Sequence, residues 1–194
     1  MARGVRWILL LRAVNLGPAN KLPMKDLKAL LEDLGHADVK TYLNSGNATF
    51  ESPARSANKL ADDIEAALVR ELHLGVRCCV RKETDLRKAL DELPDLPGYV
   101  TVTVLFDRPT PAALMAFLET DWSPEVVRGN DQVLYIGFEN AAKTKLTIAK
   151  IEKALGVGGT ARTPTTLSKL LSRPRWLSTA SSTGVGGTES PVVD

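Results

Sequence analysis

Residues 39–50 read Val-Lys-Thr-Tyr-Leu-Asn-Ser-Gly-Asn-Ala-Thr-Phe, and this stretch decides the fold class. Val39–Leu43 predicts a strand, residues 44–47 are typical of a hairpin turn, and Ala48–Phe50 predicts the returning strand. Strands joined by so short a turn pair in antiparallel fashion. This part of the chain is therefore predicted to lie in an antiparallel sheet.

The elements on either side of the hairpin complete a known order. Residues 5–14 predict a strand with apolar side chains on both faces, so we expect it to be central and covered on both sides. One helix is predicted before the hairpin, ending at Gly35, and a second between the hairpin and a strand at residues 76–81. The apolar stripes that predict these helices are Met24, Leu27, Leu30, Leu31 and Leu34, then Leu60, Ile64, Leu68 and Leu72. The resulting order, β-α-β-β-α-β, is that of a ferredoxin-like unit.

The same order recurs later in the chain, after a connecting helix and a Pro- and Gly-rich break at residues 94–98. The predicted elements are strands at 99–106, 125–128, 132–136 and 159–162, and helices from 110, at 143–155 and at 165–171. We therefore predict an α+β protein with two ferredoxin-like (βαββαβ) subdomains and antiparallel sheets, over residues 1–93 and 94–177. Residues 178–194 are rich in Ser, Thr and Gly, and we expect this tail to be disordered.

Composition and charge exclude several classes of protein. The 194 residues are 44% hydrophobic and 25% charged with two cysteines, which excludes collagen, coiled coils, disulfide scaffolds and bulk disorder. No apolar run reaches the ~18 residues that a membrane span needs, so we expect a cytoplasmic protein without a membrane segment. Residues 1–50 and 140–187 carry net charges of +3 (seven basic, four acidic) and +7 (eight basic, one acidic) around an acidic middle. Such ends indicate either an anionic partner or a solvated charged face.

Polar residues follow two strands that a ferredoxin-like sheet places side by side. In its spatial order, 4-1-3-2, the end of the first strand lies beside the start of the third. The loop at residues 15–21 is then next to the turn at residues 44–47. This edge gathers Arg12, Asn15, Asn20, Lys21, Asn44, Ser45 and Asn47. This edge suits an anion or a polar small molecule, because it combines cations, amides, a hydroxyl and the N–H groups of a helix start. The alternative is that Asn and Gly occur here only because turns favour them.

Three motifs, in order, are similar to those of a known family. They are Arg-Ala-Val-Asn-Leu-Gly at 12–17, Asn-Lys-Leu-Pro-Met at 20–24 and Thr-Tyr-Leu-Asn-Ser-Gly-Asn-Ala-Thr-Phe at 41–50. The chain thereby resembles the DUF1697 family, bacterial proteins of unknown function. The resemblance implies two ferredoxin-like subdomains that can exchange their last strands. It also implies that the family signature includes Arg12, Asn15, Asn20, Lys21, Ser45, Gly46 and Asn47.

The sequence departs from the family pattern in two places. Pro18 stands where the family usually has a second Gly after Gly17. The family's usual Arg-Asn-Trp-Asn-Thr near the C-terminus is here Arg-Thr-Pro-Thr-Thr at 162–166, which keeps Arg162 and Thr166. The resemblance therefore adds these two residues to the ligand-binding candidates.

The leading functional hypothesis is a binding module for a small anionic or nucleotide-like ligand, at the edge formed by the 12–21 loop and the 44–47 turn. One alternative is a nucleic-acid-binding protein that uses its basic termini. RNA-binding sheets of this kind need exposed aromatic residues, whereas we expect Trp7 and Phe50 to be in the core. The other alternative is an enzyme of unknown reaction using Arg12, Lys21 and Ser45.

The sequence contains no recognisable catalytic constellation or metal site. Ser45 lies in no nucleophile-elbow pattern, and no paired carboxylates or Gly-rich phosphate loop are present. Cys78 and Cys79 are adjacent in a predicted strand, so their side chains point to opposite faces and an ordinary disulfide is out of reach. We expect two reduced thiols, no metal and no cofactor.

Overall fold

The computed structural model describes residues 4–16 and 20–172 of the chain. These residues form two four-stranded antiparallel sheets and six helices. The predicted disordered tail at 178–194 lies outside the described residues. The first unit comprises β1 (Val5–Leu11), α1 (Met24–Asp33), β2 (Ala37–Tyr42), β3 (Asn47–Ser52), α2 (Ala57–Leu72) and β4 (Cys78–Lys82). After α3 (Glu83–Asp91), the second unit comprises β5 (Tyr99–Leu105), α4 (Pro111–Glu119), β6 (Val126–Gly129), β7 (Val133–Phe138), α5 (Ile148–Leu155) and β8 (Gly159–Arg162), followed by α6 (Pro164–Leu171).

Both sheets have the strand order expected of a ferredoxin-like unit. The first runs β2-β3-β1-β4 and the second β6-β7-β5-β8. In the first sheet Leu10 at the end of β1 lies opposite Asn47 at the start of β3, so the predicted juxtaposition is confirmed. The α+β fold with two ferredoxin-like units is likewise confirmed. The exchange of last strands is not, because β4 pairs with β1 and β8 pairs with β5.

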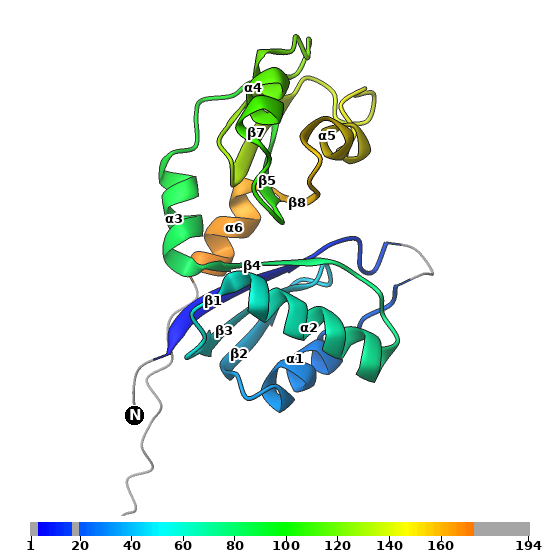
Figure 1. The fold of residues 1–194 in the computed structure, drawn as a ribbon, viewed down its shortest axis with the longest axis vertical. Helices are drawn as coiled ribbons and strands as arrows, with labels where there is room; N and C mark the ends of the chain where they lie inside the picture. The colour runs from blue at the N-terminus through cyan, green and yellow to red at the C-terminus, as the bar shows by residue number, and fades with distance from the viewer. Residues whose placement is uncertain (1–3, 17–19, 173–194) are drawn as a thin grey trace, which may run out of the picture.

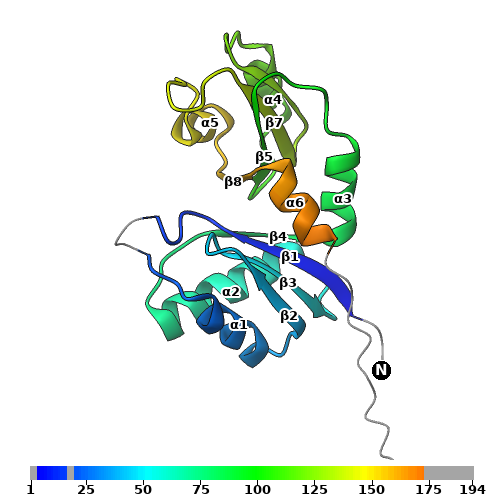
Figure 2. The ribbon, with the colours of Figure 1, turned by 180° about the vertical axis from the view of Figure 1, so that it is seen from behind.

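The elements stack in five layers (Figure 1). α1 and α2 cover the outer face of the first sheet, α3 and α6 lie between the two sheets, and α4 and α5 cover the outer face of the second. Strand β1 is buried on both faces, with Trp7, Leu9 and Leu11 toward α1 and α2, and Ile8 and Leu10 toward the second unit. Each such side chain contributes roughly 1.5–3 kcal/mol when buried. The two units therefore share an apolar core, to which α6 contributes Leu167, Leu170 and Leu171. Figure 2 shows α6 between the two units.

Two predicted elements are shorter than expected. β1 ends at Leu11 rather than at residue 14, because Ala13 and Asn15 adopt left-handed backbone conformations with φ of 53° and 56°. α5 begins at Ile148 rather than at residue 143, because the Thr147 hydroxyl caps it by accepting from the Lys150 N–H. The residues before Thr147 are thereby released as a loop.

The two cysteines are free and buried on opposite faces of β4, as predicted. Burial raises the pKa of the Cys79 thiol to about 11 and raises the pKa of Cys78 further. Among the described residues, no group of three or more His, Cys, Asp or Glu side chains is placed to hold a metal ion. In the same part of the chain, no helix has the length and apolar character to cross a bilayer.

Candidate functional site

The turn at residues 44–47 is held tightly against the end of β1. The Leu11 N–H donates to the Gly46 carbonyl at 2.8 Å. Gly46 has a φ of +73°, and a Cβ there would lie 2.6 Å from Val14 Cγ2 and 2.7 Å from Leu11 Cβ. Only glycine fits this left-handed, crowded position. Gly46 therefore has a packing reason for its place in the signature.

Asn47 is completely buried and connects three segments. Its Nδ2 donates to the Tyr42 carbonyl at 2.9 Å and to Ser45 Oγ at 2.8 Å. Its Oδ1 accepts from Nε of Arg162, in β8, at 2.6 Å. The amide thus fixes the hairpin internally and ties it to the second unit.

Arg162 uses all of its N–H groups in hydrogen bonds, three of which join the two units. Besides Asn47, it donates from Nη2 to the carbonyls of Leu11 at 2.6 Å and Ser45 at 3.0 Å. From Nη1 it donates to Thr160 Oγ1 and to the Ala161 carbonyl, each at 2.8 Å. All five acceptors are neutral, and within residues 4–16 and 20–172 no carboxylate pairs with this guanidinium. Desolvation lowers the Arg162 pKa to about 10, so the group is still cationic at neutral pH.

The two loop asparagines pin the loop after β1. Asn15 Nδ2 donates to the carbonyls of Leu22 at 2.9 Å and Asn44 at 2.5 Å, and its Oδ1 accepts from the Leu22 N–H at 2.8 Å. Asn20 Nδ2 makes one longer contact, 3.4 Å, with the Ala13 carbonyl. The side-chain amides of Asn15 and Asn20 therefore stabilise the conformation of the loop, a common role of Asn in turns. Lys21, in the same loop, is exposed and bonds to no described residue.

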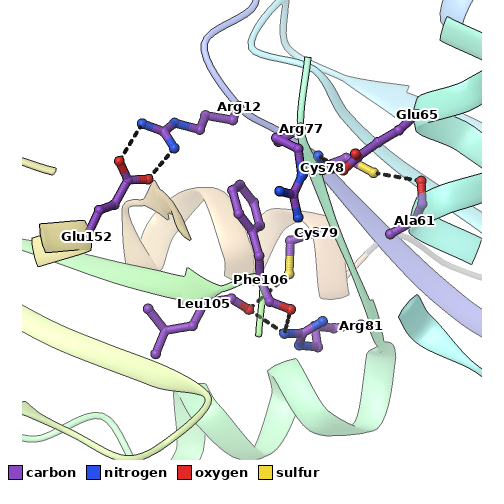
Figure 3. Close-up of polar contacts among 10 residues, drawn as sticks. All are labelled: Arg12, Ala61, Glu65, Arg77, Cys78, Cys79, Arg81, Leu105, Phe106 and Glu152. Atoms are coloured by element: carbon purple, nitrogen blue, oxygen red, sulfur yellow. Dashed lines mark hydrogen bonds and ion pairs between the residues drawn. The ribbon is translucent and has the colours of Figure 1, made fainter. Parts of the chain in front are cut away.

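Arg12 pairs with Glu152 of α5, across the two units (Figure 3). The contact is bidentate, with Arg12 Nη2 to Glu152 Oε2 at 3.2 Å and a shorter second bond from Nη1 to Oε1. Glu152 lies 140 positions from Arg12 in the sequence, so only the tertiary fold brings this acidic partner close.

Strand β4 and Arg77, the residue before it, make further contacts that fix one unit against the other. Arg81 Nη2 donates to the carbonyls of Leu105, in a short bond, and Phe106, at 3.4 Å (Figure 3). The Arg77 guanidinium lies over the Phe106 ring, 5.0 Å from its centroid. Together with the Arg12 ion pair, these contacts give the junction between the units a defined geometry.

A cavity of about 350 Å³ lies at this junction, between the end of β1, the hairpin turn, the start of β5 and the start of α6. Of the nine candidate residues, Ser45, Arg162 and Thr166 line it. Arg12, Asn15, Asn20, Lys21, Gly46 and Asn47 are not part of its lining, so three of the nine candidates share this cavity. The remaining walls are formed by Leu11, Ala13, Val14, Leu16, Tyr99, Thr101, Ala161 and Thr163.

Three polar lining residues were missed by sequence reasoning, namely Tyr99, Thr101 and Thr163. The register that pairs Val102 with Arg162 places Thr101 close to Thr163. The predicted strand order of the second unit could have indicated this closeness, because in that order the last strand pairs with the first. Thr163 also caps α6, because its Oγ1 accepts from the Thr166 N–H at 3.2 Å.

The fold and the site define a protein of two ferredoxin-like units. Between the units lies a cavity that is lined in part by the polar residues Ser45, Arg162 and Thr166. The sequence matches the family described as "Protein of unknown function (DUF1697)" over residues 5–135, and the chain belongs to this family. No curated protein matches the chain. Among solved structures, it is similar to the conserved bacterial protein SP0830 from Streptococcus pneumoniae, with 24% identity and a TM-score of 0.68. That alignment covers 86% of this chain and 97% of the other, and it shows a likeness of fold.

Proposed function

We propose that the protein binds a small anionic ligand, of the size of a phosphate ester or nucleotide, in the cavity between its two units. The observation that carries the proposal is the Arg162 guanidinium, which lines this cavity with no carboxylate partner among the described residues. A charge in partly desolvated surroundings interacts strongly with an opposite charge nearby. An anion in the cavity would compensate it.

Arg162 acts in this proposal through its charge. Its N–H groups already have five acceptors in the protein, so the guanidinium is held in place before a ligand arrives. Direct hydrogen bonds to the anion would come from the lining hydroxyls of Ser45, Thr163 and Thr166. The N-terminus of α6 also begins at this wall, and helix N-termini favour negative charge.

The apolar part of the wall suits the rest of an organic ligand. Val14, Leu16 and Tyr99 line the cavity beside the polar groups. Binding pockets commonly combine apolar walls with a few placed polar groups. This combination supports an organic anion more than a free inorganic one.

The two alternatives receive less support. Trp7 and Phe50 are each 1% exposed, so neither is available for base stacking on the first sheet. For an enzyme, Ser45 Oγ would need an activating base, but this oxygen accepts a hydrogen bond from the Asn47 amide, which is not a base. Arg12 and Lys21 do not share the cavity with Ser45.

Thermal unfolding with charged and neutral ligands tests the proposal. We expect adenosine 5′-monophosphate or glucose 6-phosphate to raise the melting temperature, because a ligand that binds only the folded state stabilises it. Adenosine and glucose, which lack the phosphate, should raise it less. Equal shifts with each charged and neutral pair, or no shift with any of them, would contradict the proposal.

Matched variants on α6 locate the effect. Thr166→Val removes a lining hydroxyl at nearly constant volume and should reduce the ligand-induced shift. Thr165→Val changes the neighbouring residue, which is exposed and outside the cavity wall, and should leave the shift unchanged. A reduction of the same size in both variants would mean that the ligand binds elsewhere.

A further inference from the structure

A second cavity, of about 720 Å³, lies within the second unit and shares no lining residue with the first. Its walls are the loop from α4 to β6 and the loop from β7 into the first turn of α5, and α4 and α5 lie side by side there (Figure 1). The lining residues are Asp121, Trp122, Ser123, Pro124, Glu125, Glu139, Asn140, Lys143, Lys145, Leu146 and Lys150.

One wall of this cavity is rigid and apolar. The Trp122 indole N–H donates to the Phe117 carbonyl at 2.8 Å, and the two rings pack with centroids 5.0 Å apart. Leu146, 4% exposed, also lines the cavity. The shape of the cavity is therefore set by core packing rather than by exposed side chains alone.

Glu125 presents a carboxylate to this cavity. The residue is only 7% exposed, and no described residue donates a hydrogen bond or forms an ion pair with its carboxylate. The carboxylate oxygens are not among the buried atoms that lack a partner, so they keep contact with the open space of the cavity that the residue lines. A carboxylate on a largely buried residue that lines a cavity without a protein partner is placed to receive a cation or an N–H donor from a ligand.

Three lysines line the same cavity and also lack acidic partners. Lys143, Lys145 and Lys150 form no ion pair within the part of the chain that the structure describes. Glu152, which lies in α5 with Lys150, is already paired with Arg12. Three ammonium groups around one cavity favour an anionic group between them.

We infer that this cavity binds a zwitterion, a small molecule that carries a primary ammonium and a phosphate or carboxylate group. The ammonium would donate to the Glu125 carboxylate, and the anionic group would lie among Lys143, Lys145 and Lys150. One ligand would then pair with both the Glu125 carboxylate and the three lysine ammonium groups. A cation alone would pair only with Glu125, and an anion alone only with the lysines.

Titration calorimetry of the full chain with O-phosphoethanolamine tests the inference. We expect saturable binding, with ethanolamine and inorganic phosphate each bound about tenfold or more weakly, since each lacks one of the two charges. Glu125→Gln keeps the side-chain shape and should weaken binding by about tenfold or more. Far-ultraviolet circular dichroism checks that each variant is folded.

Two lysine variants provide the matched comparison. The double variant Lys145→Gln, Lys150→Gln should weaken binding of O-phosphoethanolamine, whereas Lys153→Gln, on the same helix but outside the cavity, should not. Absence of saturable binding by the unmodified protein would overturn the inference. So would equal affinities of the unmodified protein and the folded Glu125→Gln or double-lysine variant.

Discussion

Nε of Arg162, in the last strand of the second unit, donates to Oδ1 of Asn47, in the first unit, at 2.6 Å. These residues are 115 positions apart. Their hydrogen bond connects the hairpin turn to Arg162, which lines the cavity at the junction of the two units. The same asparagine holds the hairpin through Tyr42 and Ser45. The side-chain amide of Asn47 therefore stabilises the hairpin and also holds Arg162 in the wall of the cavity.

Asn47→Ala should lower the free energy of unfolding by about 2–3 kcal/mol, because it removes three hydrogen bonds at a fully buried site and leaves partners unsatisfied. Urea denaturation measures the change. Ser45→Ala, at an exposed position of the same turn, should cost less than about 1 kcal/mol. A loss for Asn47→Ala no larger than that for Ser45→Ala would show that the amide network contributes little.

Gly46→Ala should destabilise the protein by about 3 kcal/mol or more, because it combines a left-handed backbone with steric overlap against Val14 and Leu11. Gly35→Ala is the control. Gly35 has a φ of +83° with nothing within 4 Å of an added Cβ, so only the conformational cost of about 1 kcal/mol applies. Chemical denaturation of both variants separates the two contributions, and equal losses would contradict the packing argument.

The Arg12–Glu152 pair should contribute a favourable coupling energy of less than about 1 kcal/mol, since both side chains are about one-third exposed to solvent (32% and 27%). A double-mutant cycle with Arg12→Gln and Glu152→Gln measures this energy. The sign should be favourable, because the contact is bidentate and bridges the units. Strictly additive single variants would mean that the pair does not hold the units together.

His36 should make the protein less stable in mild acid. Its ring stacks on Phe50 at a centroid distance of 4.5 Å, and burial lowers its pKa below the ordinary value of 6.5, partly offset by the charge of Asp63. The unfolded chain therefore takes up a proton at higher pH than the folded one. The stability that this difference contributes is present above about pH 6.5 and is lost as the pH falls below it.

The variant His36→Phe tests this pH dependence, because it keeps an aromatic ring against Phe50 and removes the titrating group. Urea denaturation at pH 7, 6 and 5 should show that the unmodified protein loses stability relative to the variant as the pH falls. A difference between the two proteins that stays constant over this range would contradict the assignment to His36.

Much of the fold was predictable because it depends on local patterns. The apolar run of β1 and the hairpin at residues 44–47 predict the pairing that sets Leu10 opposite Asn47, and the repeated element order predicts the second sheet. Loop geometry was less predictable. The cap at Thr147, which starts α5 late, competes with a helical apolar pattern that extends further back.

The candidate site was predictable only in part. Ser45, Arg162 and Thr166 do line one cavity, whereas Asn15 and Asn20 hold the loop through local bonds. The Glu152 partner of Arg12 could not be found by searching nearby residues, because packing of the two units against each other creates that contact. Sequence spacing within one unit carries no information on such packing.

The most direct test of the central claim is a two-dimensional ¹⁵N–¹H NMR titration with adenosine 5′-monophosphate. Binding in the junction cavity predicts saturable shifts of the amides of Ser45, Ala161, Thr163 and Thr166, with much smaller shifts on adding adenosine. Thr166→Val should weaken these shifts at equal ligand concentration. Saturable shifts confined to other parts of the protein, or no saturable shift at these amides with either the nucleotide or inorganic phosphate, would contradict the claim.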